Sequence, residues 1–295
     1  MDETADFVKG SLEKAYSLIK KNAQELFIEF LKVGVLSTTI SMVGLLLTGA
    51  VLFIFLGASL AGYLANLADG SAPLPALSTE GILGMIVAAM VWLISALISS
   101  AIGSVAYNVV DASARRKQIT SIREQFRKNI VPIIKLDLLK WGVIVILFLP
   151  IATSLAFGSI GTLIGLCILP ILLLIAYIIF AFLIQFSMLE LLLGGRGVLE
   201  SIKSSASLVR ANLLSVIVLD ILLVVITIAA SAGTKVIETL LQFIPSIFSL
   251  LGAWGMAAGY AIFFVMLIAL YTLVFAATQT IILPIMYYFW KGLKE

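Results

Sequence analysis

Residues 194–220 read GGRGVLESIKSSASLVRANLLSVIVLD: a glycine-rich turn, then an amphipathic stretch, then an apolar run that contains one carboxylate. Apolar residues recur at helical spacing from Leu199 to Leu213, and most of the charged and hydroxyl side chains fall on the opposite face. This order predicts a helix that lies on the membrane surface and leads directly into a membrane span.

The whole sequence is too apolar for a water-soluble domain. Of its 295 residues, 62% are hydrophobic and 12% are charged, and the mean hydropathy is +1.18. Too little polar surface exists to cover such a chain in water. Several apolar runs reach the roughly 20 residues that a helix needs to cross a membrane. We therefore expect an all-α polytopic membrane protein.

The residue types that most enzymes and metal sites use are scarce. The sequence has no histidine, and Cys167 is its only cysteine. Nothing resembles a phosphate-binding loop, a zinc motif or a nucleophile elbow. We expect no catalytic residues, no cofactor and no metal ion, and hence no enzyme activity. The charged N-terminus does not resemble a cleavable signal peptide, so the first span should direct membrane insertion.

Six apolar runs predict six transmembrane helices, arranged as three helical hairpins. The fifth run fades at residues 230–234, and residues 235–251 are interpreted as an outer interfacial or re-entrant piece. In the second run Ser95, Ser99 and Gly103 recur every four residues, a small-residue stripe that allows close approach of a neighbouring helix. The runs cover approximately residues 33–67, 82–110, 141–157, 162–193, 213–234 and 255–290, with a tight turn at residues 158–161.

Each hairpin follows an amphipathic segment, at residues 7–30, 119–133 and 199–213. These segments predict cytoplasmic surface helices, although the first could equally pack on the protein's own loops. Of the 19 Lys and Arg residues, all except Lys235 lie in the N-terminal arm, in the two segments 111–140 and 194–212, or at the C-terminus. The positive-inside rule then places both termini in the cytoplasm of a multi-pass protein of the cell membrane.

The three amphipathic segments also resemble one another. SLEKAYSLIKKN (residues 11–22) and SIKSSASLVRAN (residues 201–212) match at serines, apolar positions, a basic residue and a final asparagine. QITSIREQFRKN (residues 118–129) matches less well. We interpret residues 1–295 as one membrane domain with a pseudo-threefold repeat, its units being 1–110, 111–193 and 194–295. Chance similarity among amphipathic helices is the alternative.

The opening stretch resembles the signature region of a broad six-span membrane family. That family includes the integral membrane domain fused to some glycerophosphoryl diester phosphodiesterases, and its glycine-containing turn leads to a helix that ends in "R-x-N" before a span. The resemblance implies a six-span fold over the whole chain. The soluble phosphodiesterase domain is missing, so that activity is not expected. The matching residues are Gly195, Gly197, Ser201, Ser205, Arg210 and Asn212.

Six polar residues near the predicted cytoplasmic ends of the spans form a candidate cluster. Asp220 lies eight positions, or roughly 12 Å of helix, after Asn212. If the fifth span begins at Asn212, Asp220 approaches the bilayer midplane and needs a partner, a proton or water. If the span begins later, Asp220 lies at the cytoplasmic edge. For Asn22, Asn129 and Asn212, a role in capping or buttressing the junction between surface helix and span is favoured over ligand binding. The cluster consists of Asp111, Asp137, Glu190, Arg210, Asn212 and Asp220.

The densest basic segment, residues 111–140, predicts contacts with anionic lipid headgroups on the cytoplasmic side. The positive-inside rule already explains this charge, so no nucleic-acid partner is expected. The favoured function is a membrane-organising, lipid-interacting or scaffolding role, with membrane lipids and possibly a protein partner or a second copy as ligands. The alternative is a channel or carrier for an ion or lipid-like substrate, with Asp220 in the pathway. The predicted headgroup contacts are Arg115, Arg116, Lys117, Arg123, Arg127 and Lys128.

Overall fold

The fold is helical, as the composition predicts. The computed structural model describes residues 2–68, 79–117, 119, 121–154 and 169–294, and these residues contain helices and short connections but no strand. The all-α class is therefore confirmed. The helices are α1 (Asp2–Ala68), α2 (Thr79–Gly103), α3 (Val105–Ala114), α4 (Ile122–Ser154), α6 (Leu169–Ile184), α7 (Ser187–Leu192), α8 (Val198–Ala211), α9 (Leu213–Leu241), α10 (Phe243–Ser249) and α11 (Gly252–Gly292).

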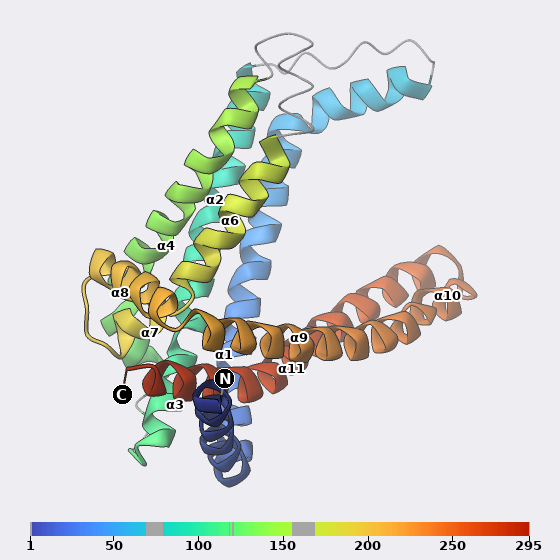
Figure 1. Cartoon of the computed structure of the whole chain (residues 1–295). Helices are drawn as coiled ribbons and strands as arrows, with labels where there is room; N and C mark the ends of the chain where they lie inside the picture. Colours follow the sequence, from blue (N-terminus) through green and yellow to red (C-terminus); the bar gives the residue numbers. More distant parts are fainter. Residues whose placement is uncertain (1, 69–78, 118, 120, 155–168, 295) are drawn as a thin grey trace.

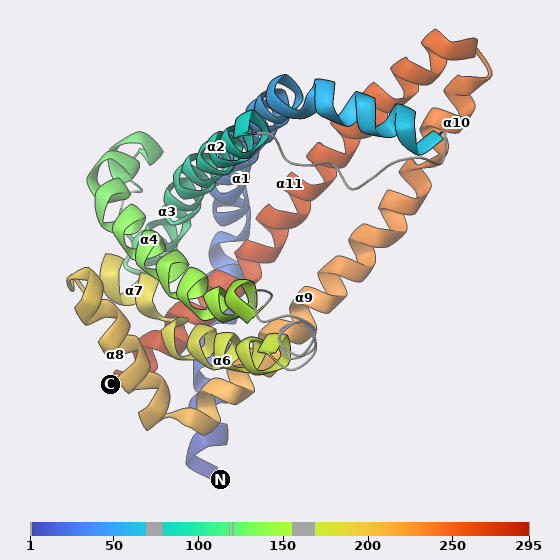
Figure 2. The same ribbon diagram turned by 90° about the horizontal axis from the view of Figure 1, so that it is seen from above.

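Two arms diverge from a common base (Figure 1). One arm contains α2, α4, α6 and the long middle part of α1, and the other is the hairpin of α9 and α11 with α10 at its tip. The base gathers α3, α7, α8 and both chain ends. α1 packs against α2 on one side and α11 on the other, which joins the arms. The view from above shows α9 and α11 as two rods that converge toward α10 (Figure 2), and Tyr271 of α11 also donates to Glu238 of α9.

Five stretches of helix are long and apolar enough to cross a membrane, within the part of the chain that the structure describes. A 29-residue helix such as α9 is about 43 Å long, so it crosses a hydrocarbon core of about 30 Å only when tilted or protruding. The turn at 158–161, Cys167 and parts of the third and fourth predicted spans lie outside the described residues. The five stretches are Thr4–Phe55, Gly81–Ala114, Leu169–Leu192, Leu213–Ser249 and Gly252–Gly292.

Two of the three repeated asparagines interrupt a helix in the same way. Asn22 has φ −126° and ψ 18° inside α1, and Asn212 has φ −125° and ψ 36° between α8 and α9. The amide of Asn212 donates to the carbonyl of Leu208 at 3.1 Å, which caps α8. Asn129 lies within the continuous helix α4. The predicted surface helix at 119–133 is consequently not separate, because most of it is the first part of α4.

The third hairpin is longer and more regular than its sequence suggests. α9 is continuous through residues 230–234 to Leu241, so the helix itself does not end where the fifth span is predicted to fade. Thr234 stays in the helix by donating its hydroxyl to the carbonyl of Ala230 at 2.8 Å. Only the short α10 departs from the hairpin, and it packs on the start of α11. A Cβ atom at Gly259 would lie 2.9 Å from the Cα of Pro245, so glycine permits this contact.

The small-residue stripe of α2 packs against α1, as predicted. The hydroxyls of Ser99 and Ser37 lie 2.6 Å apart, and Ser41 donates to Ser99 at 3.0 Å. A Cβ atom at Gly44 would overlap the side chain of Ser95. Close backbone approach and hydroxyl bonds therefore hold these two helices together, which is the usual means of packing when lipid surrounds them.

The face of α8 that packs on the protein combines serines with apolar side chains, among them Val198 and Ile202. Ser201, Ser205 and Val209 are buried, whereas Leu199 is 61% exposed. Ser205 accepts a hydrogen bond from the backbone N–H of Phe186 at 3.1 Å and donates to the carbonyl of Leu183 at 2.9 Å. These bonds satisfy the backbone at the break between α6 and α7. Ser205 thus fastens α8 to the end of α6 and the start of α7.

Candidate functional site

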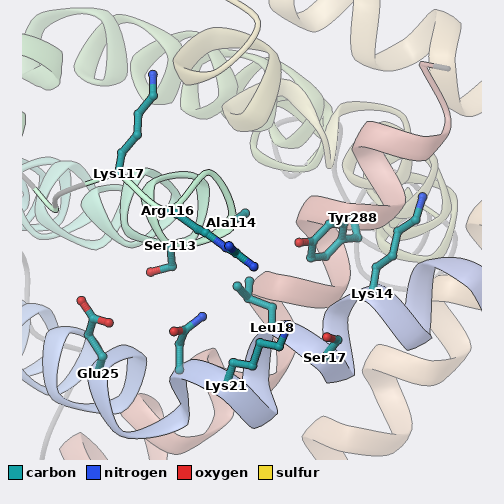
Figure 3. Close-up of a pocket in the computed structure, with 11 residues that line it drawn as sticks. Lys14, Ser17, Leu18, Lys21, Glu25, Ser113, Ala114, Arg116, Lys117 and Tyr288 are labelled. Atoms are coloured by element: carbon teal, nitrogen blue, oxygen red, sulfur yellow. The ribbon is translucent and has the colours of Figure 1, made fainter.

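A pocket of about 730 Å³ opens at the base, between the N-terminal part of α1, the end of α3 and Tyr288 of α11 (Figure 3). We call it the basic pocket. Its cationic side chains outnumber its carboxylates, because Glu25 is the only acidic residue in its lining. Such an excess of positive charge favours an anionic ligand. The cationic residues are Lys14, Lys21, Arg116 and Lys117.

The α1 wall of the basic pocket follows from helical spacing. Lys14, Ser17, Leu18 and Lys21 are separated by three or four residues, so they share one face of the helix and all line the pocket. Asn22 comes directly after them, and its backbone break redirects α1. The pocket therefore lies where the chain changes direction, between the surface segment and the long part of α1.

Arg116 reaches the basic pocket from a backbone conformation that usually requires glycine. It has φ +54° and is the only non-glycine residue with positive φ in the described part of the chain. Its N–H donates to the carbonyl of Ser113 at 3.3 Å, and the N–H of Lys117 donates to that of Ala112 at 2.9 Å. This is the hydrogen-bond pattern of a Schellman motif at the end of α3. A left-handed non-glycine residue costs about 1–2 kcal/mol, and such strain is typical of functional positions.

A buried hydroxyl at this site also lacks a hydrogen-bond partner among the described residues. Ser113 lines the basic pocket, and its Oγ atom is buried without a hydrogen-bond partner in the described structure. Buried hydroxyls nearly always have a partner. An anionic oxygen in the pocket would accept from Ser113 while the cationic side chains neutralise its charge.

The six predicted headgroup contacts divide into three groups. Arg116 and Lys117 line the basic pocket. Arg115 instead donates to Asp111 at 2.7 Å, and this hydrogen bond and the charge of Asp111 raise the pKa of the Arg115 guanidinium. The remaining three, which are Arg123, Arg127 and Lys128, are exposed at the start of α4.

Glu190 forms the most connected polar contact of the base. Its side chain is completely buried. It accepts hydrogen bonds from the indole N–H of Trp290 at 2.8 Å and pairs with Lys294 at 3.2 Å and with Arg196 at 3.2 Å. Lys294 also lies over the ring of Trp290, 4.5 Å from its centroid. Glu190 therefore ties α7 and the glycine-rich turn to the end of α11.

Asp111 makes a comparable contact at the end of α3. Its carboxylate accepts from the hydroxyl of Tyr287 at 2.9 Å as well as from Arg115. Tyr287 and Trp290 are three residues apart on α11, so one turn of α11 bonds both to α3, through Asp111, and to α7, through Glu190. Asp111 and Glu190 therefore both bond to the same end of α11.

The glycines of the signature turn have separate structural reasons. A Cβ atom at Gly194 would lie 2.6 Å from the carbonyl oxygen of Glu190 and 2.9 Å from its Oε2 atom. Gly195 has φ +65°, a conformation that glycine adopts without strain. The N–H of Gly197 donates to Glu200 at 3.3 Å, which caps α8. The turn therefore positions Arg196 beside Glu190.

The other members of the predicted cluster lie in different surroundings. Asp137 is buried in α4 and accepts a hydrogen bond from Ser100. Arg210 is exposed near the end of α8, and Asn212 caps that helix. Asp220 is half-buried, eight residues into α9, and no hydrogen bond or ion pair reaches it from the described residues. The contacts therefore do not join all six into one cluster.

Lys14, Lys21 and Ser113 were not among the predicted site residues. The helical spacing of Lys14 and Lys21 indicated a shared face, but only the tertiary approach of α3 shows that this face lines a pocket. Trp290 was not among them either, and its indole N–H bonds to Glu190. Within the described residues, no group of three His, Cys, Asp or Glu side chains could hold a metal ion.

These helices and this base define a helical, membrane-associated protein with a basic pocket at one end. Residues 33–289 match the family described as a domain of unknown function, DUF7847, and the chain belongs to that family. No curated protein and no solved structure matched the chain. The resemblance to the membrane domain fused to glycerophosphoryl diester phosphodiesterases stays a prediction.

Proposed function

We propose that the protein is a non-enzymatic, multi-pass protein of the cell membrane that binds anionic lipid headgroups at its base and so organises lipids or partner proteins there. The basic pocket is the observation that carries this proposal. A headgroup phosphate placed in it would meet Arg116, Lys117 and the two lysines of α1. Each cationic residue close to an anionic surface contributes about 1 kcal/mol.

The proposal includes six spans in three hairpins, with the base and both termini in the cytoplasm. The like dihedral angles at Asn22 and Asn212 support equivalent junctions in the first and third repeat units. The contacts of Asp111 and Glu190 with one turn of α11 support equivalent ends for the first two hairpins. The basic residues then face the anionic inner leaflet, which fits the positive-inside rule.

Lipid binding is tested on the purified full chain in a neutral detergent. Short-chain phosphatidylglycerol and short-chain phosphatidylcholine are titrated at low and at high salt, and the dissociation constants are measured by thermophoresis. We expect phosphatidylglycerol to bind more tightly, and its advantage to shrink at high salt. Equal affinity for the two lipids would contradict the proposal.

A matched pair of variants locates the binding. Arg116→Gln should weaken phosphatidylglycerol binding about tenfold or more, because a hydrogen bond to a charged group is worth about 1.5–3 kcal/mol. Arg127→Gln, which removes an exposed charge outside the pocket, should change the affinity about twofold at most. Equal losses in both variants would favour diffuse attraction by the basic surface over a site in the basic pocket.

The second candidate function is a channel or carrier for an ion or lipid-like substrate with Asp220 in the pathway. It is favoured by the absence of a partner for Asp220 among the described residues, eight residues into α9, since carboxylates within a membrane usually serve a substrate or proton path. Proteoliposome flux should fall in Asp220→Asn and not in Glu124→Gln, an exposed site on α4. Unchanged flux in Asp220→Asn would remove that residue from any pathway.

A further inference from the structure

The basic pocket has more room and more positive charge than one phosphate group can use. Its volume of about 730 Å³ falls within the range of about 300–1,000 Å³ that is typical of sites for small molecules. Its lining carries four cationic side chains and the single carboxylate of Glu25. A phosphodiester has one negative charge, so a headgroup with one phosphate would leave most of this positive charge without a counterion.

The four cationic side chains of the basic pocket are not neutralised by the described part of the chain. Other cations of the base, such as Arg115 and Lys294, pair with carboxylates, but no ion pair reaches these four from any described residue. Even Glu25, four residues after Lys21 on α1, forms no ion pair with it. Charges of one sign therefore face each other from α1 and from α3, and they repel. A multiply charged anion between the two walls removes this repulsion.

The groups that can bind an anion are spread along the basic pocket rather than gathered at one point. Figure 3 shows Ser113 toward one end of the pocket, and Lys14 and Tyr288 toward the other. Arg116 reaches from α3 into the space between α3 and α1. Lys14 and Lys21 share one face of α1 but lie seven residues, or about 10 Å, apart along the helix. Donors for an anion are therefore present at both ends of the pocket.

The first end combines Arg116 and Lys21 with the hydroxyl of Ser113. The buried Oγ atom of Ser113 has no partner among the described residues, so its hydrogen is available to a phosphate oxygen. A guanidinium such as that of Arg116 binds phosphate through two parallel hydrogen bonds. Glu25 follows Lys21 along α1 and repels any further negative charge on that side. A ligand with a second phosphate must therefore extend the other way, toward Lys14.

The second end offers donors for a further phosphate. Lys14 and Ser17 are three residues apart on one face of α1, and Tyr288 of α11 adds a hydroxyl to the same lining. An ammonium group and hydroxyls all donate hydrogen bonds to phosphate oxygens. We infer that the basic pocket binds a headgroup with two phosphate groups joined by a short linker, the first at Ser113 and Arg116 and the second at Lys14. This inference rests on the headgroup binding proposed above and names the class of headgroup.

Three short-chain lipids test this inference on the purified full chain in a neutral detergent, with dissociation constants measured by thermophoresis. Phosphatidylglycerol has one phosphodiester, phosphatidic acid has one phosphate monoester with a charge of about −1.5 to −2, and cardiolipin has two phosphodiesters joined by one glycerol. We expect cardiolipin to bind at least about tenfold more tightly than either other lipid, because its second phosphate binds intramolecularly once the first is in place. Phosphatidic acid controls for total charge.

An advantage of cardiolipin of about twofold or less is the statistical effect of offering two phosphates to one site, and it would overturn the inference. So would equal affinity for cardiolipin and phosphatidic acid, because charge alone would then explain the binding. The proposed function fails on a different result, namely equal affinity for phosphatidylglycerol and phosphatidylcholine, so the two failures are distinguishable.

A matched pair of variants on α1 locates the second phosphate. Lys14→Gln should weaken cardiolipin binding about tenfold, because a hydrogen bond to a charged group is lost, and should change phosphatidylglycerol binding about twofold at most. Lys20→Gln, exposed on the same helix and outside the pocket lining, should change both affinities about twofold at most. Equal losses in the two variants, or equal losses for the two lipids in Lys14→Gln, would contradict a phosphate site at Lys14.

A soluble bisphosphate distinguishes a lipid from a free ligand. Glycerol 1,3-bisphosphate has the two phosphates and the linker of cardiolipin without acyl chains. It should bind more tightly than glycerol 1-phosphate, and equal binding of these two would overturn the inference. Binding of the bisphosphate as tight as that of cardiolipin would support the inference with a soluble ligand, whereas weaker binding than that of cardiolipin would support it with a lipid.

Discussion

Glu190→Gln should destabilise the base without changing its shape. The buried carboxylate pairs with Arg196 and Lys294, whose side chains are 43% and 31% exposed, so solvent screens both pairs and each contributes nearer to 1 kcal/mol than to the value of a fully buried pair. Its hydrogen bond with Trp290 loses about half its strength when the acceptor becomes neutral. The new amide also points donor hydrogens at a cationic partner. Together these losses predict a decrease of about 2–4 kcal/mol in the free energy of unfolding.

Equilibrium unfolding of the purified protein in mixed micelles of a mild detergent and dodecyl sulfate measures this decrease. Glu29→Gln is the matched control, because among the described residues Glu29 pairs with Lys32 alone, whose side chain is 57% exposed, and should cost less than about 1 kcal/mol. Trp290→Phe removes the indole donor alone and should cost about 1–2 kcal/mol. A Glu190→Gln variant as stable as the Glu29→Gln control would refute the view that Glu190 holds the base together.

Three further substitutions test individual contacts, each by the free energy of unfolding. Ser205→Ala leaves the N–H of Phe186 and the carbonyl of Leu183 without their bonds and should cost about 1–3 kcal/mol, whereas Ser207→Ala, exposed on the same helix, should cost almost nothing. Gly195→Ala at φ +65° should cost about 1–2 kcal/mol, and Gly195→Asn, which tolerates this conformation better, should cost less. Asn212→Ala removes a cap worth about 1 kcal/mol, and Asn129→Ala within continuous α4 should be nearly neutral.

The sequence predicted the helices well because apolar length is a local property. It also predicted an internal repeat in which Asn22 and Asn212 correspond; the two residues have similar backbone angles, and the repeat itself stays a prediction. Asn129 does not interrupt its helix, although its segment resembles those of Asn22 and Asn212. Asparagine is only mildly unfavourable in a helix, and α4 buries Ile133 and Leu136 just beyond it. Packing there keeps the helix continuous.

The orientation of α8 could not be predicted from amphipathicity alone. In a water-soluble protein, the apolar stripe of an amphipathic helix faces the protein core. In the structure Leu199 is exposed, whereas Ser201, Ser205 and Val209 of the same helix are buried. The basic pocket was missed for a different reason: its walls come from α1 and α3, which are about 90 residues apart in sequence, and no local pattern reports that they meet.

Three nearly consecutive residues of α11 connect the features of the base. Tyr287 bonds to Asp111, Tyr288 lines the basic pocket, and Trp290 bonds to Glu190. A ligand in the basic pocket therefore touches the helix turn that also joins the ends of the other hairpins. If bound lipid orders this turn, it strengthens both carboxylate contacts at once, and the stabilisation by lipid should diminish in Glu190→Gln as well as in Arg116→Gln. Coupling of this kind follows from shared contacts on one rigid helix end and requires no movement of the two arms.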